Sequence, residues 1–595
     1  MNKKMIWFFH KNICTFFSHF FMVILMKNII LIMKDKVPKI IIMIIFLIIE
    51  VYCDLSLPFY TADIVNMGIR NTDFNVITTT GINMTIMLII SVIAAIIVSY
   101  FSSIISSSYA RDLREKIFEK ILSFSNHEMN NFSKASLITR STNDINQIQH
   151  VLGIMFRTLL FAPILALGSI IRVFELSISL SWIILVAFIS VALLLGIVIT
   201  NVTPYFKKSQ EIVDHINRVS REILLGIPVI KAFVRQDYEN KRFDRYNQEY
   251  LKVNLHIYRN MFILIPAMNL ILNLMIIIIL YFGSFEALKG TLLTGDIIAF
   301  TQYSTQMISS FIMMGGFIIM LPRFMVSVNR VEEVLSSDIS ITTGEKVNNQ
   351  NVDVIEFKDV SYIYPNAQKE TLSNINFKLY PGKQTAIIGG TGSGKSTILN
   401  LIPRLQDVSG GEILLNDVNI KEWDIDELRS KMALTPQNAI LFSGSIRSNL
   451  LVGNIDATDE DMINAVKLAC VDEFIDSLDD DVSQGASNFS GGQRQRLSIA
   501  RSIVKNHSFY LFDDCFSALD VATEKKIYAN LKEFTRDSSV LIVSQRISSI
   551  KDADEIIVLD DGHIVDKGKH DELKSRCLIY QEIISSQLEK VGDSL

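Results

Sequence analysis

Cysteine is scarce in this chain of 595 residues, and its five cysteines are scattered at positions 14, 53, 470, 515 and 577. They form no CxxC pair and no metal-ligand spacing, which argues against a disulfide framework or a thiolate metal site. The chain also lacks a strong charge of either sign, since its formal net charge is only −5. Such a mild balance argues against a nucleic-acid partner.

Hydropathy divides the chain into two halves. The mean hydropathy of +0.32 is too high for an ordinary soluble protein and too low for a chain that lies wholly in a membrane. Residues up to about position 325 carry long runs rich in Ile, Leu, Met and Phe, whereas residues after about position 350 mix charged and apolar positions. We therefore expect an α-helical membrane domain followed by a soluble α/β domain.

Six apolar stretches in the first half are long enough to cross a bilayer, which takes about 20 residues in a helix. They are 38–60, 81–105, 153–174, 177–200, 261–284 and 296–322. The long connections 106–152 and 201–260 are amphipathic and rich in Lys and Arg, whereas the loops 66–80 and 285–294 hold very few basic residues. The positive-inside rule therefore places both chain ends and both long connections in the cytoplasm, with the connections continuing the spanning helices.

The first 25 residues admit three interpretations. Their basic start and apolar middle fit a signal peptide, but no small-residue cleavage site follows. They also fit a helix that lies in the membrane interface. In the third interpretation, translation starts at Met26. We favour an extension that is either retained uncleaved or wrongly included in the reading frame.

Two carboxylates fall inside the first expected span. Glu50 and Asp54 are separated by one helical turn and therefore share a face. Acidic groups at membrane depth are costly and are candidate functional groups. They are expected either to contact a substrate or simply to lie near the outer end of the span or bond to a neighbouring helix.

The second half carries a phosphate-binding pattern in the string "AIIGGTGSGKST". An apolar strand, a glycine-rich loop and a helix follow one another, which is the context that makes this pattern specific. The residues expected to bind the phosphates are Gly389, Gly390, Thr391, Gly392, Ser393, Gly394, Lys395, Ser396 and Thr397. In this pattern backbone N–H groups surround the phosphates, the lysine reaches the outer ones and the serine coordinates Mg²⁺.

A second apolar run, "FYLFDD", predicts a parallel strand that is buried on both faces. Asp513 at its end is expected to hold Mg²⁺, directly or through water, and Asp514 to face the γ-phosphate. The string "NFSGGQRQRLSIARSI" then predicts a helix that starts near Ser490. Its N-terminus is a second phosphate site, formed by Ser490, Gly491, Gly492 and Gln493, and such a site implies that ATP is sandwiched between two domains of this kind.

Together these strings resemble an ABC exporter half-transporter, in which a type I exporter-like membrane domain precedes an α/β P-loop ATP-binding domain. The resemblance spans roughly residues 30–590. It implies an N-terminal cytoplasmic or interfacial segment (1–37), a transmembrane domain (38–335), a linker (336–352) and an ATP-binding domain (353–595). It also implies cytoplasmic coupling regions at 136–149 and 226–243.

The resemblance assigns further residues of the nucleotide site. Tyr364 matches the aromatic residue that stacks on adenine. Gln437 matches the Q-loop glutamine between the nucleotide and membrane domains, and it is expected to be a catalytic residue and a metal ligand. Asp520 closes the "SALD" string, which matches the D-loop, and it is expected to be among the cofactor-binding residues. The implied cofactors are ATP and Mg²⁺. The implied partners are a second half-transporter, membrane lipid, and a small-molecule or peptide substrate, and the implied location is the plasma membrane.

Two positions depart from the family pattern. Asp514 replaces the glutamate that follows the metal-binding aspartate, and Gln545 replaces the switch-loop histidine. The binding residues remain complete, which resembles the degenerate subunit of bacterial heterodimeric multidrug-type exporters. Two alternatives stay open, namely a homodimer that uses Asp514 as a slow base and an ATP-occupancy sensor that transports nothing.

Overall fold

The computed structural model describes residues 34–346, 353–365 and 367–592, and the expected features of residues 1–25 lie outside them. The chain divides into two compact units. The first takes in the described residues up to Leu122 together with Lys134–Ser337. The second takes in Ser123–Ser133 and the described residues from Asp338 onward. A short segment from the first long connection therefore belongs to the second unit, which the sequence did not predict.

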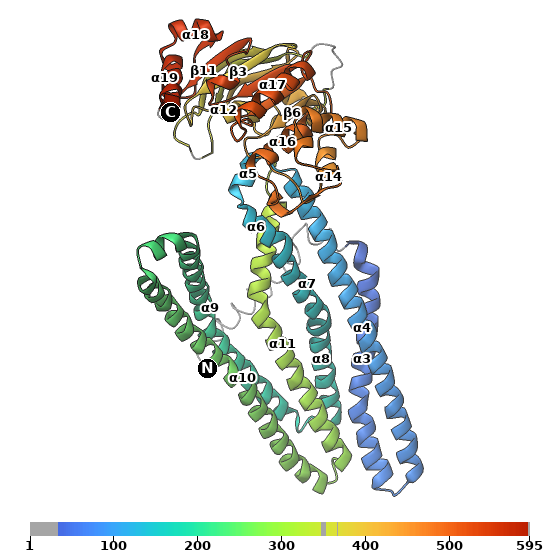
Figure 1. The fold of residues 1–595 in the computed structure, drawn as a ribbon. Helices are drawn as coiled ribbons and strands as arrows, with labels where there is room; N and C mark the ends of the chain where they lie inside the picture. Colours follow the sequence, from blue (N-terminus) through green and yellow to red (C-terminus); the bar gives the residue numbers. More distant parts are fainter. Residues whose placement is uncertain (1–33, 347–352, 366, 593–595) are drawn as a thin grey trace. The chain divides into compact units, whose positions relative to one another are not determined.

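The first unit is entirely helical in its described residues (Figure 1). Its α-helices are α3 (Val37–Asp63), α4 (Phe74–Leu122), α6 (Lys134–Thr139), α7 (Ile145–Ile154), α8 (Leu160–Leu176), α9 (Ser181–Ala232), α10 (Gln236–Leu288) and α11 (Thr294–Leu335). A 3₁₀ turn, η1 (Lys34–Lys36), precedes them, and three π-helical turns adjoin them: η2 (Ile64–Ile69), η3 (Arg140–Asp144) and η4 (Met155–Leu159).

Among the described residues, five helical stretches have the length and apolar composition to cross a membrane. They are Val37–Ile69, Phe74–Leu122, Lys134–Leu176, Ser181–Ala232 and Gln236–Leu288. Four of the six predicted spans fall within them, and a fifth, 177–200, begins four residues before Ser181–Ala232. The sixth, 296–322, lies in α11, which is not among the five.

The long helices extend well beyond a bilayer. The helices α9 and α10 have 52 and 53 residues. At about 1.5 Å per residue each is nearly 80 Å long, against about 30 Å of hydrocarbon. The prediction that the connection 201–260 continues the spanning helices is therefore confirmed. Figure 1 shows α9 and α10 running side by side as a pair.

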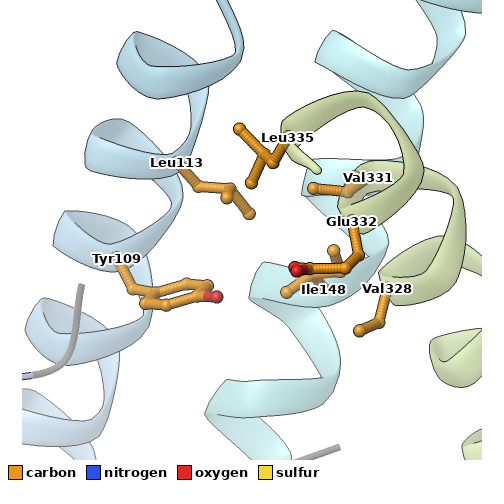
Figure 2. Close-up of a pocket in the computed structure, with 7 residues that line it drawn as sticks. All are labelled: Tyr109, Leu113, Ile148, Val328, Val331, Glu332 and Leu335. Carbon is orange, nitrogen blue, oxygen red and sulfur yellow. The ribbon is translucent and has the colours of Figure 1, made fainter. Parts of the chain in front are cut away.

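The remaining helices of the first unit share an apolar core. Buried side chains of α3, α4, α7 and α11 form one cluster, which includes Met43, Tyr109, Val151 and Val328. Between α4, α7 and α11 this packing leaves a small cavity (Figure 2). Its walls are apolar except for one carboxylate and one phenol, and they consist of Tyr109, Leu113, Ile148, Val328, Val331, Glu332 and Leu335.

The second unit is built on a six-stranded sheet in the order β12-β11-β3-β10-β9-β6. All neighbours are parallel except β11 and β12. The strands of this sheet are β3 (Gln384–Gly389), β6 (Met432–Thr435), β9 (Phe509–Asp513), β10 (Ser539–Val543), β11 (Glu555–Asp560) and β12 (His563–Gly568). An antiparallel sheet in the order β2-β1-β4-β5 adds β1 (Ile355–Tyr362), β2 (Leu372–Leu379), β4 (Gly410–Leu415) and β5 (Val418–Asn419), and a third pairs β7 (Gly444–Ser445) with β8 (Asp481–Val482).

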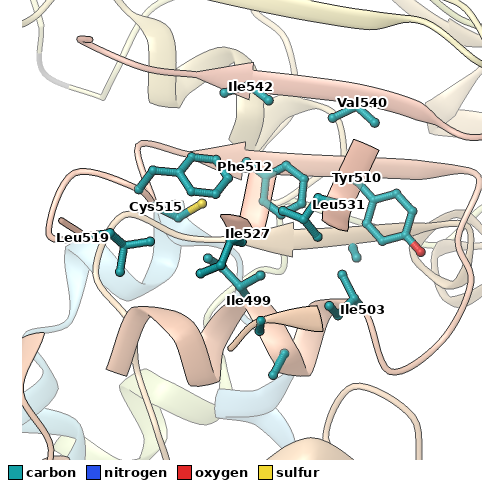
Figure 3. Packing of buried hydrophobic residues seen from close by; sticks show 14 of the residues in the cluster. Ile499, Ile503, Tyr510, Phe512, Cys515, Leu519, Ile527, Leu531, Val540 and Ile542 are labelled. Atoms are coloured by element: carbon teal, nitrogen blue, oxygen red, sulfur yellow. The ribbon is translucent and has the colours of Figure 1, made fainter. Parts of the chain in front are cut away.

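Helices cover both faces of the six-stranded sheet. The helices of the second unit are α5 (Asn126–Asn131), α12 (Lys395–Leu401), α13 (Ile425–Ser430), α14 (Ile446–Leu451), α15 (Asp459–Leu468), α16 (Gly491–Ser502), α17 (Val521–Phe534), α18 (His570–Arg576) and α19 (Leu578–Gly592), with short 3₁₀ turns η5 (Ile420–Glu422), η6 (Val471–Glu473), η7 (Gln484–Ala486) and η8 (Ile547–Ser549) between them. Along β9, Tyr510 and Phe512 enter one core cluster and Leu511 enters the other. Figure 3 shows the first of these clusters, with Ile499 of α16 and Ile527 of α17 against the strand. The predicted burial of this strand on both faces is confirmed.

Candidate nucleotide site

Sheet topology gathers the predicted site residues at one edge. In β10, Val543 pairs with Ile387 of β3 on one side and with Asp513 of β9 on the other. The carboxyl ends of these parallel strands therefore lie at the same level, and the loops that follow them meet there. In open α/β sheets this edge is where ligands bind.

The glycine-rich loop connects β3 to α12, as the sequence predicts. Its first glycine, Gly389, touches β11, because a Cβ there would stand 2.0 Å from the carbonyl oxygen of Leu559. Gly394 has φ +98°, in the left-handed region that favours glycine, and it is the residue at which α12 begins. Gly390 and Gly392 face open space, since no atom lies within 4 Å of a Cβ built there. The loop thus leaves room along its backbone for a phosphate chain.

Lys395 lies inside the curve of this loop. Its Nζ donates hydrogen bonds to the carbonyl oxygens of Gly389 at 2.9 Å and Gly390 at 2.6 Å. Burial lowers the pKa of its ammonium group, while the carboxylates of Asp514 and Asp513 oppose that shift. A buried cation held only by carbonyl and hydroxyl oxygens is well matched to an incoming phosphate.

Two oxygen atoms that could bind a metal ion lie together at the predicted Mg²⁺ site. The hydroxyl of Ser396 donates to Oδ1 of Asp513 over 3.1 Å. Burial raises the pKa of Asp513, and the hydrogen bond from Ser396 opposes that rise. Hydroxyl and carboxylate oxygens with space beside them for phosphate oxygens and water are the ligands that Mg²⁺ prefers. The residues present therefore fit this ion.

Asp514 is buried between two loops. Its Oδ2 accepts from the side-chain amide of Gln437 and its Oδ1 from the backbone N–H of Gln545, each over 3.4 Å. Its own N–H donates to the carbonyl oxygen of Val543 at 2.8 Å. The residue has φ +45°, a conformation that aspartate tolerates better than most residues. The side chain of Gln545 is exposed beside this group.

Tyr364 lies beside the start of α12. Its hydroxyl and that of Thr397 are 3.1 Å apart, and its ring meets Tyr362 edge-on with centroids 4.9 Å apart. The predicted adenine-stacking residue is therefore brought to the phosphate loop by the end of β1.

The predicted second phosphate site begins a helix, as expected. Ser490 is the N-cap of α16, and its side chain accepts from the backbone N–H of Gln493. The side chain of Gln493 completes this capping box, because its Oε1 accepts from Ser490 N over 2.8 Å. Ser490 and Gly491 are exposed. Among the described residues, no hydrogen bond joins these positions to the glycine-rich loop. Within one chain this site therefore stays apart from the loop.

Asp520 caps another helix. Its Oδ1 accepts from the backbone N–H groups of Ala522 and Thr523 at 3.1 and 3.0 Å, at the start of α17. These hydrogen bonds hold the pKa of Asp520 below its usual range. Its predicted role in cofactor binding stays a prediction.

The sequence did not single out Gln495, whose side chain contacts both the loop after β6 and the loop after β9. Its Nε2 lies 3.4 Å from the carbonyl oxygen of Gln437, and its Oε1 accepts from Ala518 N over 3.1 Å. Gln495 is buried, although it stands within the polar string "GGQRQR". The signal in the sequence was its helical spacing, four residues before the apolar Ile499, which places both side chains on one face of the helix.

Comparisons with known proteins agree with this architecture. The family model for the ABC transporter transmembrane region matches residues 40–311, and a second model, described as ABC transporter, matches residues 372–517. An uncharacterized ABC transporter ATP-binding protein of Mycobacterium tuberculosis is 35% identical, over 91% of this chain and 94% of its own length. The chain belongs to the ABC transporter family. It is a half-transporter with its membrane domain fused to an ATP-binding ATPase domain.

Two further comparisons concern export. A Staphylococcus aureus protein named for multidrug export and for an ATP-binding/permease architecture is 30% identical, over 85% of this chain and 89% of its own. A solved bacterial Atm1-family ABC exporter with ATP bound has the same fold, with a TM-score of 0.78 and 22% identity over 93% of this chain and 98% of that one. The half-transporter thus has an exporter fold, and ATP hydrolysis coupled to transport follows from its family. Half-transporters of this family work as dimers in a membrane.

Proposed function

We propose that this half-transporter is one subunit of a heterodimeric exporter, and that its own nucleotide site binds ATP but hydrolyses it slowly. The observation that carries the proposal is an asymmetry in one site. Lys395, Ser396, Asp513 and Tyr364, which are the residues expected to bind ATP and Mg²⁺, are all present, whereas substitutions affect the two positions expected to serve hydrolysis. Random decay would also have removed binding residues.

The chemistry of Asp514 supports slow hydrolysis. Its side chain is one methylene shorter than glutamate, so its carboxylate stands about 1.5 Å further from the attacking water, and a displacement of about 1 Å can cost about 10²-fold in rate. Its oxygens lie within hydrogen-bonding range of Gln437 and Gln545 instead. In this role Asp514 orients or deprotonates water poorly.

The chemistry of Gln545 points the same way. An amide can still donate a hydrogen bond to the γ-phosphate. It cannot gain a proton near neutral pH, so it supplies neither the charge nor the proton transfer of a histidine. In this proposal ATP binding is retained and turnover is slowed.

Mg²⁺ would be held by Ser396 and Asp513, with Gln437 completing the set. The ion supplies charge neutralisation between the outer phosphates. Lys395 adds the second positive charge, and the loop glycines supply backbone N–H groups.

The exposed helix start at Ser490–Gln493 serves the other site in this proposal. Backbone N–H groups at a helix N-terminus bind phosphate. Because Ser490 and Gly491 are exposed and apart from this chain's own loop, they are available to a nucleotide bound by a second subunit. The partner's site then contains the competent glutamate and histidine.

Transport follows by alternating access. ATP binding closes two ATP-binding domains on each other, the cytoplasmic ends of the long helices transmit the closure, and hydrolysis at the partner's site resets it. The basic connections face the cytoplasm in this arrangement. A lipophilic or drug-like substrate suits the apolar spans and the name of the Staphylococcus relative.

The two carboxylates of the first span differ as candidates for contact with the substrate. The hydroxyl of Ser91 on α4 donates to Asp54 Oδ1 over 2.7 Å, so this carboxylate has a partner on a neighbouring helix. Glu50, one turn earlier, is half-buried. Of the pair, Glu50 is therefore the better candidate for contact with a cationic substrate.

Purification of the tagged chain from its native membrane, followed by mass spectrometry, tests the proposal. The expected result is a second half-transporter in equal amount, which carries a glutamate and a histidine at the positions of Asp514 and Gln545. Recovery of this chain alone as a dimer would overturn the heterodimer and leave Asp514 as the working base.

A further inference from the structure

The C-terminal helix α19 places one polar side chain on the face that packs against the core. Tyr580 is fully buried, and Ile583 and Ile584 pack against the same apolar cluster. Gln587 is two turns beyond Tyr580, and positions i, i+3, i+4 and i+7 share one helical face. An amide on such a face needs hydrogen-bond partners to offset its loss of water.

Both polar side-chain atoms of Gln587 form hydrogen bonds with the loop after β10, which contains Gln545 and is called the switch loop below. Its Nε2 donates to the carbonyl oxygen of Gln545 over 2.7 Å, and its Oε1 accepts from the N–H of Ile547 over 3.0 Å. The two bonds enclose the backbone between these residues. A carboxamide side chain carries a donor and an acceptor on the same carbon atom, so it can make both bonds at once.

The same loop is held from its other side. The guanidinium of Arg546 donates to the carbonyl oxygen of Ser517 at 2.8 Å and forms an ion pair with Glu524 at 3.5 Å. The backbone of Gln545 is thus bonded at its N–H by Asp514 and at its carbonyl by Gln587. These two bonds fix the direction from which the Gln545 side chain leaves the backbone.

We propose that Gln587 is a positioning residue of the nucleotide site, which holds Gln545 where its amide reaches the γ-phosphate of ATP. This inference rests on the proposed function, because that function assigns Gln545 to the γ-phosphate. ADP has no γ-phosphate. Loosening the switch loop therefore weakens the binding of ATP and leaves the binding of ADP unchanged, and the readout is the preference for ATP over ADP.

The experiment uses the full transporter, as purified with its partner, in lipid nanodiscs. This chain is photolabelled with 8-azido-ATP in the cold, and ATP or ADP competes for the label. Gln587→Met keeps the length and apolar contacts of the side chain but removes both hydrogen bonds. The preference for ATP is expected to fall about fivefold, the effect of one net hydrogen bond, with unchanged ADP affinity.

Gln581→Met is the matched control. Gln581 lies on the same helix, but its amide donates to the carbonyl oxygen of Lys574 over 2.8 Å. This variant is expected to keep the wild-type preference. Gln587→Glu is the second test variant, because it retains an acceptor for Ile547 and loses the donor for Gln545. It is expected to lose preference in the same direction as Gln587→Met.

Gln545→Ala distinguishes a failure of the inference about Gln587 from a failure of the proposed function. If Gln545→Ala lowers the preference for ATP and neither Gln587 variant does, Gln587 has no positioning role and the proposed function survives. If Gln587→Met weakens ATP and ADP equally, Gln587 only supports the fold, and the inference is also overturned. If the wild-type chain takes no label, or Gln545→Ala has no effect, the γ-phosphate assignment fails and the inference fails with it.

Discussion

The side-chain amide of Gln437 donates to the carboxylate of Asp514, with 3.4 Å between Nε2 and Oδ2. The other carboxylate oxygen accepts from Gln545 N over the same distance. Both bonds are longer than the usual 2.9–3.0 Å of an N–H···O bond. Asp514 therefore lies between the loops that follow β6 and β10 without being tightly held by either. A longer acid at this position could reach past both.

Asp514→Glu combined with Gln545→His should restore hydrolysis at this chain's site. The added methylene moves the carboxylate towards the attacking water, and the imidazole supplies a titratable donor. We expect the rate of hydrolysis at this site to rise at least about tenfold, and phosphate release by the purified transporter to rise with it. Vanadate trapping of nucleotide on this chain, resolved from its partner by electrophoresis, measures the site separately.

Asp514→Asn with Gln545→His is the control for that pair. It retains the size of the side chain and removes the negative charge, so trapping should stay at the wild-type level. If the Glu–His variant also traps no more nucleotide than the wild type, slow turnover has another cause than these two residues.

Lys395→Ala should weaken ATP binding by this chain. The lysine is buried in the glycine-rich loop and donates to Gly389 and Gly390, so its loss removes the cation that phosphate would meet. We expect the Kd for ATP to rise at least about tenfold. Lys383→Ala is the matched control, since Lys383 precedes the same strand and pairs with Asp554 at the surface. Equal affinity in the two variants would contradict the assignment.

Local pattern was sufficient to predict the strand–loop–helix unit around Lys395 and the start of α16 at Ser490. Both depend on residues that are close in sequence, namely glycines, a capping serine and an apolar run. The burial of β9 followed in the same way from its unbroken apolar stretch.

Contacts between distant segments could not be predicted. The segment Ser123–Ser133 joins the second unit because Ser125 Oγ meets Ser340 Oγ at 2.9 Å and Asn126 N donates to Leu405 O at 3.3 Å. Gln587 reaches Gln545 across a shorter gap of 42 residues. No periodicity encodes such pairs, and in both cases the sequence showed only a polar residue beside an apolar run.

Substitution of the two neighbouring glycines of α16 separates a folding role from a role at the partner's nucleotide. A Cβ on Gly492 would lie 3.0 Å from the carbonyl oxygen of Ala518, whereas a Cβ on Gly491 meets nothing within 4 Å in the described chain. Gly492→Ala should therefore lower the thermal stability of the transporter, and Gly491→Ala should not.

Gly491→Ala should nevertheless lower the ATPase activity of the assembled transporter, by about tenfold, because the added methyl meets the nucleotide held by the second subunit. Thermal unfolding and phosphate release on the same preparation check both statements. Full activity in Gly491→Ala would show that no nucleotide approaches this surface.

Glu128 should make the stability of the transporter depend on pH. The residue is 4% exposed, and its Oε2 accepts from Ser125 N at 2.7 Å while its Oε1 accepts from Ser340 N at 3.2 Å. Burial raises the pKa of Glu128, but the hydrogen bonds from Ser125 and Ser340 outweigh it, so the pKa lies below its usual 4.5. An unfolded chain binds this proton more readily than the folded one. The stabilisation is therefore complete above the unfolded pKa and is lost as the pH falls through the folded pKa.

Glu128→Gln cannot ionise, so it should lower the free energy of unfolding by about 1–2 kcal/mol at neutral pH. Its difference from the wild type should stay constant down to about pH 5.5 and shrink below about pH 4.5. Thermal unfolding of the full transporter at a series of pH values measures this difference, with Glu115→Gln, at an exposed position of α4, as the control. The free energies of unfolding of Glu128→Gln and the wild type could instead differ by the same amount at every pH. That result would mean that these hydrogen bonds do not stabilise the ionised carboxylate.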